Sequence, residues 1–360
     1  MTKMGQMMKR EKLRLAINGF GRIGRNLLRA YVKYPADFSL IEIVAINDVA
    51  DADILLHLLK FDSTHGRFGQ DDGTQVCLLD KGGDTYLSIT AGGKSCDILL
   101  LQQSDPKRLP WEGLCIDIVL ECTGQFRSYR DAIKHKLAGA AQVIVGAAPF
   151  DEVDASIVIG VNDNSLSRTL SVISGVSCTT QALVPLLQVL DSDFGIDSVM
   201  MTEIHAVTAD QSVLDKAHRD FRRARASGHN IIPTTSSSIN ATERVLPTMR
   251  GKINGHSIRV PTINVAAIDI TVKFNTPQNC DGVKSALIAA SQSRLQGIMA
   301  YTDEPLVSSD FIGNRHSLVI DGQQLMQAGE LIKIYAWYDN EWGYANRLLQ
   351  MCQKLALCPS

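Results

Sequence analysis

Cys178 has the sequence surroundings of a nucleophile. The four residues Ser177-Cys-Thr-Thr180 follow the apolar run 170–174 and precede a helix-like stretch, residues 181–190. A cysteine at the start of a helix lies beside unpaired N–H groups and the positive end of the helix dipole, which favour an anion. We therefore expect the Cys178 thiol to ionise more readily than a free thiol and to serve in covalent catalysis. The alternative is a buried cysteine that only packs, which is the commoner case for a lone cysteine.

A glycine-rich turn near the start of the chain suits a dinucleotide. The apolar run 13–18 leads into Gly19-Phe-Gly-Arg-Ile-Gly24 and a helix-like stretch, 25–34, and the next apolar run ends on Asp48. In such units the glycines permit a tight turn, a close backbone approach to a pyrophosphate and close helix packing, while the acid binds the ribose 2′-hydroxyl. Because a carboxylate repels a 2′-phosphate, we predict NAD rather than NADP. The predicted contacts are Gly19, Gly21, Arg22, Ile23, Gly24 and Asp48.

The elements that must position these residues change character along the chain. The first half holds further apolar runs at 97–101, 116–121, 142–145 and 156–160, with a helix-like stretch at 129–138. This alternation is typical of a doubly wound parallel sheet. The second half holds longer runs rich in β-branched residues, at 198–205, 257–261, 264–273, 317–321 and 331–337. Few helices separate them, which favours an α+β domain with a mostly antiparallel or mixed sheet.

We place the first domain at residues 1–177, completed by a closing helix at 345–360, and the second at 178–344. The glycine-rich region 66–93 is expected to form turns and hairpins. Cys122-Thr-Gly-Gln125 follows a predicted strand, where ligands of open α/β sheets bind. Thr123 and Gly124 are therefore either cofactor contacts or part of a plain turn.

Composition excludes several classes of protein. The chain has 360 residues and 45% hydrophobic residues, which is ordinary for a globular protein. Its formal charge of −2 provides no global positive field and so argues against nucleic-acid binding. No apolar run reaches the length of a membrane span, and residues 1–12 lack the apolar core of a signal peptide, so we expect a frayed extension there. The eight cysteines form no CxxC pair, which argues against zinc and disulfides and for reduced thiols in the cytoplasm.

Several polar residues of the second half could complete a site around Cys178. His205 ends a predicted strand, and it is either structural or the base of a thiol–imidazole pair. The arginines at 219, 222, 223 and 225 form either a solvated or subunit-contacting loop or a phosphate site, and the hydroxyls of 234–238 allow the same two interpretations. Arg259 lies inside a predicted strand, where a charge needs a carboxylate or an anionic ligand.

Eight motifs, in order along nearly the whole chain, resemble the glyceraldehyde-3-phosphate dehydrogenase superfamily. They are Asn18-Gly-Phe-Gly-Arg-Ile-Gly-Arg25, Phe61-Asp-Ser-Thr-His-Gly-Arg-Phe68, Ser177-Cys-Thr-Thr180, His205-Ala-Val-Thr208, Arg222-Arg-Ala-Arg225, Asn230-Ile-Ile-Pro233, Arg259-Val-Pro261 and Trp337-Tyr-Asp-Asn-Glu-Trp-Gly-Tyr344. The resemblance implies a Rossmann NAD-binding domain and a homotetramer. It also implies that the cysteine and the histidine meet at the nicotinamide.

The resemblance assigns roles residue by residue. Cys178 would attack an aldehyde to give a thiohemiacetal, and His205 would take the thiol proton and hold the oxyanion. Thr208 and Arg259 would hold the substrate phosphate. A second anion site, for inorganic phosphate, would comprise Ser177, Thr179, Arg223, Ser236 and Ser237. Asn340 would fix the nicotinamide amide, with Tyr344 beside it.

Two departures from the family pattern concern the second anion site. Ser174-Gly-Val-Ser-Cys-Thr-Thr-Gln181 differs from the usual Ser-Asn-Ala-Ser-Cys-Thr-Thr-Asn, and Thr235-Ser-Ser-Ser-Ile-Asn240 replaces Ser-Thr-Gly-Ala-Ala-Lys. Other stretches, such as 305–311 and 316–322, resemble the erythrose-4-phosphate dehydrogenase branch, which releases the acyl group to water. Asp48 and Thr208, in contrast, resemble the glycolytic enzyme.

The sequence therefore predicts NAD-dependent oxidation of a small phosphorylated sugar aldehyde. Erythrose 4-phosphate, giving 4-phosphoerythronate, is placed ahead of glyceraldehyde 3-phosphate with inorganic phosphate as second ligand. The rival from another class is an NAD- or RNA-binding scaffold without activity.

Overall fold

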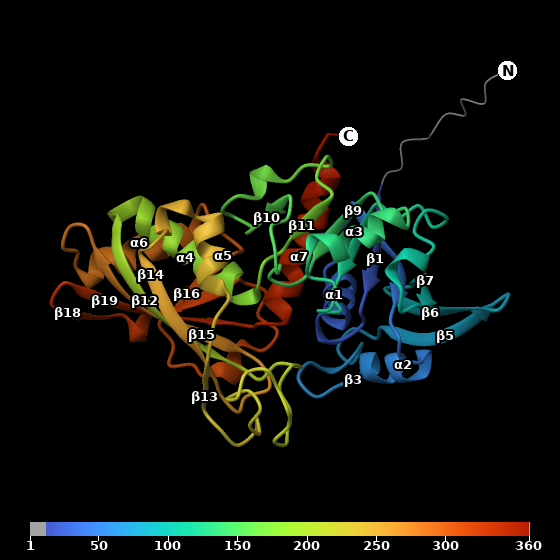
Figure 1. Cartoon of the computed structure of the whole chain (residues 1–360), viewed down its shortest axis with the longest axis horizontal. Coiled ribbons are helices and arrows are strands. Elements are labelled where there is room, and N and C mark those ends of the chain that lie inside the picture. Colours follow the sequence, from blue (N-terminus) through green and yellow to red (C-terminus); the bar gives the residue numbers. More distant parts are fainter. Residues whose placement is uncertain (1–11, 360) are drawn as a thin grey trace.

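The computed structural model describes residues 12–359, which form two lobes, each built on one large sheet (Figure 1). The frayed extension was predicted at residues 1–12, and all of these but the exposed Lys12 lie outside the described residues. Helix α7 (Trp342–Leu357) runs between the lobes and belongs to the core of the first. The division at 1–177 and 178–344 stays a prediction.

The first sheet has nine strands in the order β10-β11-β9-β8-β1-β2-β7-β6-β5. Their bounds are β1 Leu13–Asn18, β2 Ile41–Asn47, β5 Gln75–Lys81, β6 Asp84–Ala91, β7 Lys94–Leu101, β8 Ile118–Glu121, β9 Gln142–Val145, β10 Ala155–Ser156 and β11 Val172–Ser174. All neighbours from β10 to β7 pair in parallel, whereas β7, β6 and β5 are joined by hairpins. The parallel strands carry near-continuous apolar runs because helices cover both faces.

Three helices cross over between the parallel strands of this lobe. They are α1 Arg22–Lys33, α2 Ala52–Lys60 and α3 Tyr129–Leu137, and a short ribbon, β3 Phe61–Asp62 with β4 Gly66–Arg67, follows α2. Helix α1 starts immediately after the glycine turn and packs against α7, and the fully buried Leu27 and Leu28 belong to the apolar core that they share. This packing fixes the start of α1 relative to the carboxyl ends of β1 and β8.

The second sheet is mixed, with the order β13-β14-β12-β15-β19-β17-β16 and β18 paired to β19. Its strands are β12 Ile196–His205, β13 Ile232–Thr234, β14 Ile253–Arg259, β15 Ala266–Phe274, β16 Met299–Thr302, β17 Leu318–Asp321, β18 Met326–Ala328 and β19 Leu331–Tyr338. Helices α4 Cys178–Phe194 and α6 Cys280–Gln292 pack on it in one apolar core, and α5 Ser238–Val245 lies beside α4 (Figure 1).

The predicted fold class is confirmed, with a parallel first sheet and a mixed second sheet. Helices α2, α5 and α6 were not predicted. The apolar run 156–160 was predicted as a strand, but only Ala155–Ser156 pairs. The chain turns away after Ser156 because Asn162 bonds back to this segment, through Val158 N and Ser156 O.

Candidate active site

Cys178 is the first residue of α4, as the sequence predicts. Ser177 caps the helix, since its hydroxyl accepts a hydrogen bond from Thr180 N at 3.1 Å. The residue before it, Val176, has a φ of 51°, an unusual value for a β-branched residue. The Tyr344 hydroxyl donates to the Val176 carbonyl at 2.9 Å and so braces the strained turn. Tyr344 thus lies beneath the Cys178 turn and is buried.

The thiol faces an imidazole. Cys178 Sγ lies 3.6 Å from Nε2 of His205, the last residue of β12. The two residues are distant enough in sequence that only the packing of α4 on the second sheet brings them together. A thiol and an imidazole at this distance can exchange a proton.

The other imidazole nitrogen has two competing partners. The Ala206 carbonyl oxygen lies 2.7 Å from His205 Nδ1, and Arg259 Nη1 lies 2.8 Å from the same nitrogen. The carbonyl only accepts hydrogen bonds and the guanidinium only donates them, so each selects a different tautomer of His205. Arg259 reaches this position because β12 and β14 pair in parallel with His205 opposite Arg259.

The surroundings keep both groups neutral. Burial raises the pKa of the Cys178 thiol to about 12, and the Glu203 carboxylate adds to the rise. Burial and then the positive charge of Arg259 lower the pKa of His205 from 6.5 to about 4. The expectation that the helix N-terminus makes the thiol more acidic is therefore wrong here, because desolvation of the thiolate outweighs the helix dipole. A neutral thiol must lose its proton before it reacts as a thiolate, and His205 Nε2 is a possible acceptor at 3.6 Å.

A buried carboxylate that the sequence reasoning missed lies behind the pair. Glu203 has 4% of its surface exposed, and its Oε1 lies 3.9 Å from His205 Nε2. The Thr179 hydroxyl donates to Glu203 at 2.8 Å, and the Tyr338 hydroxyl lies 2.8 Å from Thr179 Oγ1. Thr179 was predicted to bind an anion, but its hydroxyl proton is committed to a carboxylate.

Two of the predicted anion ligands, Thr208 and Arg223, contact Asp210. Its carboxylate accepts a hydrogen bond from the Thr208 hydroxyl and another from Arg223 Nη1 at 2.9 Å. Arg223 Nε also donates to Thr234 Oγ1 at 2.9 Å. Arg259 Nη1 lies 3.4 Å from Thr208 Oγ1, so the two predicted ligands of the substrate phosphate are neighbours. Among the predicted ligands, Arg223 and Thr208 hold an internal carboxylate where an external anion was expected.

The two serines of the predicted phosphate loop lie at the start of α5. Ser237 is its N-cap residue and makes no side-chain capping bond, and Ser236 Oγ accepts a hydrogen bond from Ser238 N at 3.2 Å. Ser177 Oγ lies 3.3 Å from Ser238 Oγ. The loop therefore contacts the Cys178 turn, as a shared site requires.

The glycine turn has the shape that a dinucleotide needs. Gly19 has a φ of 93°, and a Cβ there would lie 2.6 Å from Thr123 N, while a Cβ on Gly24 would lie 2.2 Å from Gly19 O. Gly21 faces open space, since a Cβ on this residue would meet no atom within 4 Å. It is also the N-cap of α1, and no side chain caps this helix end or places an acid in its first turn. Free N–H groups and open space fit a pyrophosphate.

The acidic residue after β2 and the turn after β8 flank the glycines. Asp48 lies directly beyond β2 and accepts hydrogen bonds from Phe20 N at 2.7 Å and Ala50 N at 3.0 Å. Thr123 donates through both its N–H and its hydroxyl to Glu121, and Gly124 has a φ of 71°. Glu121 is in turn 3.0 Å from Nε2 of the buried His135. This turn is therefore held from beneath by buried polar groups.

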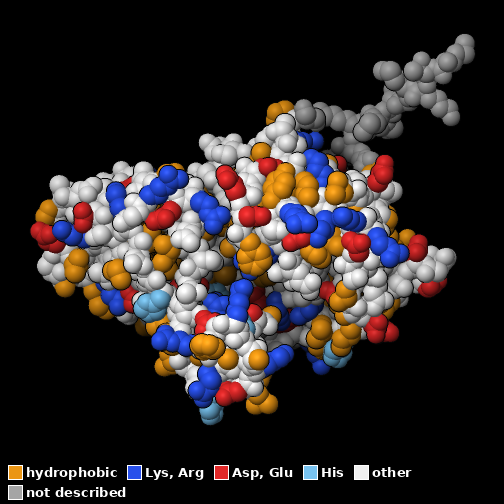
Figure 2. Space-filling model, in the orientation of Figure 1, with side chains coloured by type: hydrophobic (Ala, Val, Ile, Leu, Met, Phe, Trp, Pro, Cys, Tyr) orange, Lys and Arg blue, Asp and Glu red, His pale blue; other side chains and the backbone are white. Residues whose placement is uncertain are grey.

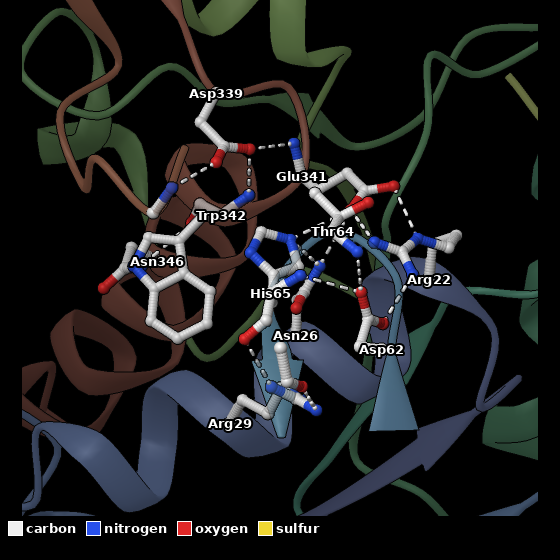
Figure 3. A network of polar contacts seen from close by, with 12 residues as sticks. Arg22, Asn26, Arg29, Asp62, Thr64, His65, Asp339, Glu341, Trp342 and Asn346 are labelled. Atoms are coloured by element: carbon white, nitrogen blue, oxygen red, sulfur yellow. Dashed lines mark hydrogen bonds and ion pairs between the residues drawn. The ribbon is translucent and has the colours of Figure 1, made fainter. Parts of the chain in front are cut away.

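Figure 3 shows how the glycine turn is joined to the segment that precedes α7. Arg22 Nε donates to Glu341 Oε1 at 2.7 Å, and the same guanidinium pairs with Asp62. His65 Nε2 lies 3.1 Å from Glu341 Oε2. The neighbouring Asn340 is 7% exposed, and its Oδ1 has no hydrogen-bond partner among the described residues. A buried, unpaired amide oxygen fits the predicted contact to a nicotinamide amide.

Comparison with known proteins agrees with these features. Residues 13–129 match the family model of the glyceraldehyde 3-phosphate dehydrogenase NAD-binding domain, and residues 177–340 match that of the C-terminal domain. The chain belongs to the glyceraldehyde-3-phosphate dehydrogenase family. It is a dehydrogenase of that type, with an NAD-binding domain, and the scaffold alternative is not supported.

The relatives of this family member bear on its branch. Glyceraldehyde-3-phosphate dehydrogenase 1 of Bacillus subtilis is 41% identical, covering 96% of this chain and 98% of the relative. The Geobacillus stearothermophilus enzyme is 42% identical over the same shares, and enzyme 2 of Streptomyces avermitilis is 43% identical over 94% and 97%. All three are named glyceraldehyde-3-phosphate dehydrogenase. The predicted preference for the erythrose-4-phosphate dehydrogenase branch gains no support from them.

Two features are absent from the described residues, a metal-binding cluster and a membrane-spanning helix. Within residues 12–359, no group of three or more His, Cys, Asp or Glu side chains is arranged to hold a metal ion. No helix in the same range is long and apolar enough to cross a membrane.

Proposed function

We propose that this protein oxidises a small phosphorylated aldehyde with NAD, with glyceraldehyde 3-phosphate ahead of erythrose 4-phosphate. The observation that carries the proposal is the arrangement of Cys178, His205 and Arg259. The thiol faces one imidazole nitrogen at 3.6 Å, and a guanidinium that suits a phosphate lies 2.8 Å from the other. The names of the relatives favour the triose, which reverses the order expected from the sequence.

Cys178 and His205 perform the first step of this chemistry. The sulfur bonds to the aldehyde carbon while His205 Nε2 takes the thiol proton, because the pKa values near 12 and 4 keep thiol and imidazole neutral beforehand. Nε2 accepts that proton only if Nδ1 carries its own proton and donates to the Ala206 carbonyl. The protonated imidazole then donates to the oxyanion of the thiohemiacetal. Oxidation leaves a thioester on Cys178.

NAD, when bound, supplies the hydride acceptor. The residues proposed to hold it are the glycine turn with Arg22 and Ile23, Asp48 at the ribose, Thr123 and Gly124 beside the turn, and Asn340 and Tyr344 at the nicotinamide. Their positions around the uncapped start of α1 and the unpaired Asn340 oxygen support this assignment. Thr208 and Arg259 are proposed to bind the substrate phosphate, and Ser177, Arg223, Ser236 and Ser237 to line the second anion site.

Erythrose 4-phosphate stays the second candidate because of the second anion site. Thr179 is committed to Glu203, and Arg223 is committed to Asp210. Both observations weaken a site for inorganic phosphate, which the glycolytic reaction needs and hydrolysis does not.

A homotetramer in the cytoplasm is our proposal for the state of the protein. The loop 209–231 exposes four large apolar side chains, and Figure 2 shows apolar and basic side chains interleaved on this projecting part of the molecule. They are Val213, Leu214, Phe221 and Ile231, exposed by 71% to 90%. Such a cluster favours contact with another protein chain. No disulfide joins any of the eight cysteines, all of which lie within residues 12–359, and this favours a reducing compartment.

Steady-state NADH formation with each aldehyde, with and without inorganic phosphate, tests the proposed function. We expect a higher kcat/KM for glyceraldehyde 3-phosphate than for erythrose 4-phosphate, and no activity in the Cys178→Ser variant. A higher kcat/KM for the tetrose would restore the order that the sequence suggested. If neither aldehyde gives NADH, the proposal is contradicted.

A further inference from the structure

Glu203 is a buried carboxylate to which the proposed chemistry assigns no role. It lies two residues before His205 on β12, so both side chains point to the same face of the sheet, toward Cys178. Its exposed fraction is 4%, and a carboxylate taken out of water costs stability unless it is paired. Within residues 12–359, the one basic group within ion-pair distance of Glu203 is the His205 imidazole, at 3.9 Å.

The contact is with the imidazole nitrogen that reacts. Glu203 approaches Nε2, the nitrogen that faces Cys178, whereas Nδ1 is occupied by Ala206 and Arg259. Glu203 therefore does not orient the ring from behind, as the acid of a catalytic triad does. The negative charge of Glu203 therefore acts on groups that lie between His205 Nε2 and Cys178 Sγ. A protonated His205 is stabilised there, and an approaching anion is repelled.

The same carboxylate disables one ligand of the second anion site. Thr179 is adjacent to Cys178, and its hydroxyl donates to Glu203 at 2.8 Å instead of facing outward. Arg223 is held by Asp210 at 2.9 Å and lies 3.6 Å from Asp220. The Ser177 hydroxyl lies 2.8 Å from Thr180 Oγ1 and 3.3 Å from Ser238 Oγ, so it has other hydroxyl partners for its proton. Phosphate dianion would thus meet the carboxylates of Glu203, Asp210 and Asp220 and few free donors near the thioester.

We propose that Glu203 directs the acyl group on Cys178 to water rather than to inorganic phosphate. This inference rests on the thioester of the proposed function. Water oxygen bonds to the thioester carbonyl carbon while His205 Nε2 takes one water proton, and Glu203 stabilises the imidazolium. The C–S bond then breaks, the sulfur regains the proton from His205, and the acid product leaves as a carboxylate with release of the second proton to solvent. Glu203 is a positioning residue in this step, since it acts through His205.

Removal of the charge should affect the two half-reactions differently. During acylation, negative charge develops on the sulfur as its proton passes to His205. Glu203 opposes this charge and favours the imidazolium, so its effects on acylation largely cancel. Deacylation by water gains from a stabilised imidazolium, whereas deacylation by phosphate suffers from repulsion. The ratio of turnover with phosphate to turnover without it is therefore the quantity that reports on Glu203.

The test compares the wild type with Glu203→Gln, which keeps an oxygen for the Thr179 hydroxyl. Rapid mixing with NAD and glyceraldehyde 3-phosphate gives the NADH burst, and the following steady state is measured with and without phosphate. For the wild type we expect continued turnover without phosphate and less than about a twofold gain on its addition. For Glu203→Gln we expect a burst rate within about threefold, phosphate-free turnover reduced about tenfold, and about a tenfold stimulation by phosphate.

Asp197→Asn is the matched control, because Asp197 is an exposed acid on the same strand. It should behave as the wild type. A wild type that stops after the burst until phosphate is added would overturn the inference but leave the proposed function intact. The inference would also be overturned if Glu203→Gln showed a normal burst and the same ratio of turnover with phosphate to turnover without it as the wild type. A loss of the burst in Glu203→Gln would assign Glu203 to acylation and also overturn it, whereas no wild-type burst would remove the proposed function itself.

Discussion

Arg259 Nη1 lies 2.8 Å from Nδ1 of His205, close enough to donate a hydrogen bond to it. A hydrogen bond from Arg259 requires an unprotonated Nδ1, which places the single proton of a neutral imidazole on Nε2, toward Cys178. In that tautomer His205 cannot accept the thiol proton. An anion that draws the guanidinium away lets Nδ1 donate to the Ala206 carbonyl at 2.7 Å and frees Nε2 to act as a base.

Replacement of Arg259 by Gln should therefore selectively weaken the binding of phosphorylated substrates. Loss of a charged hydrogen-bond donor should raise the KM for glyceraldehyde 3-phosphate by about 10- to 100-fold. Unphosphorylated glyceraldehyde should lose little in kcat/KM, because His205 no longer needs to be released. Steady-state kinetics with both aldehydes checks this. Equal losses of kcat/KM for the two aldehydes would show that Arg259 does not bind the substrate phosphate.

The acylation rate should not depend on a histidine that titrates near its ordinary pKa. The pKa of His205 is lowered to about 4 by burial and by Arg259, so the neutral base is present at all pH values well above 4. The NADH burst with saturating glyceraldehyde 3-phosphate, whose phosphate releases His205 from Arg259, should therefore stay level as the pH falls from 7 to about 5. His205→Asn should lower the burst rate by about 10²- to 10⁴-fold. A tenfold fall of the wild-type burst per pH unit below 6.5 would contradict the depressed pKa.

The ion-pair network of Figure 3 should support both stability and NAD binding. Burial would raise the pKa of Glu341, but His65 and Arg22 outweigh it and hold the pKa below its ordinary value. Glu341→Gln should lower the free energy of unfolding by about 1–3 kcal/mol and weaken NAD binding through Arg22 and Asn340. Urea unfolding and fluorescence titration with NAD measure the two effects. The exposed Glu304→Gln is the control, and equal behaviour of the two variants would refute the coupling.

Cofactor choice should depend on the charge of Asp48. Asp48→Asn keeps a hydrogen-bond acceptor for Phe20 N but removes the repulsion of a 2′-phosphate. The ratio of kcat/KM for NADP to that for NAD should rise about tenfold or more. Asp53→Asn, on the exposed face of α2, should leave the ratio unchanged. If Asp48→Asn also leaves it unchanged, another residue discriminates between the cofactors.

Much of the fold could be predicted because the decisive signals are local. The apolar run 13–18, the glycines and the helix after them lie within one continuous stretch, and β1 and α1 form there. Cys178 at the start of α4 follows from the same kind of pattern. Helices α2, α5 and α6 were missed because each is short or interrupted by polar residues, and tertiary packing decides their formation.

The charges around Cys178 could not be predicted in the same way. Arg259 reaches His205 only through the parallel pairing of β12 and β14, which no local pattern reveals. Asp210 meets Arg223 through the path of a loop. Glu203 did leave a signal, since a charged residue alternates with His205 on a predicted strand and so shares its face. Burial of the thiol, which reverses its expected acidity, depends on the whole packed site.

The most direct test of the central claim is a single turnover followed by analysis of Cys178. Enzyme, NAD and glyceraldehyde 3-phosphate are mixed without inorganic phosphate, quenched with acid at the end of the burst, and digested for mass spectrometry. We predict NADH stoichiometric with the chain and the acyl group on the peptide that carries Cys178. A burst of NADH without acylation of Cys178, or acylation of another cysteine, would contradict the account.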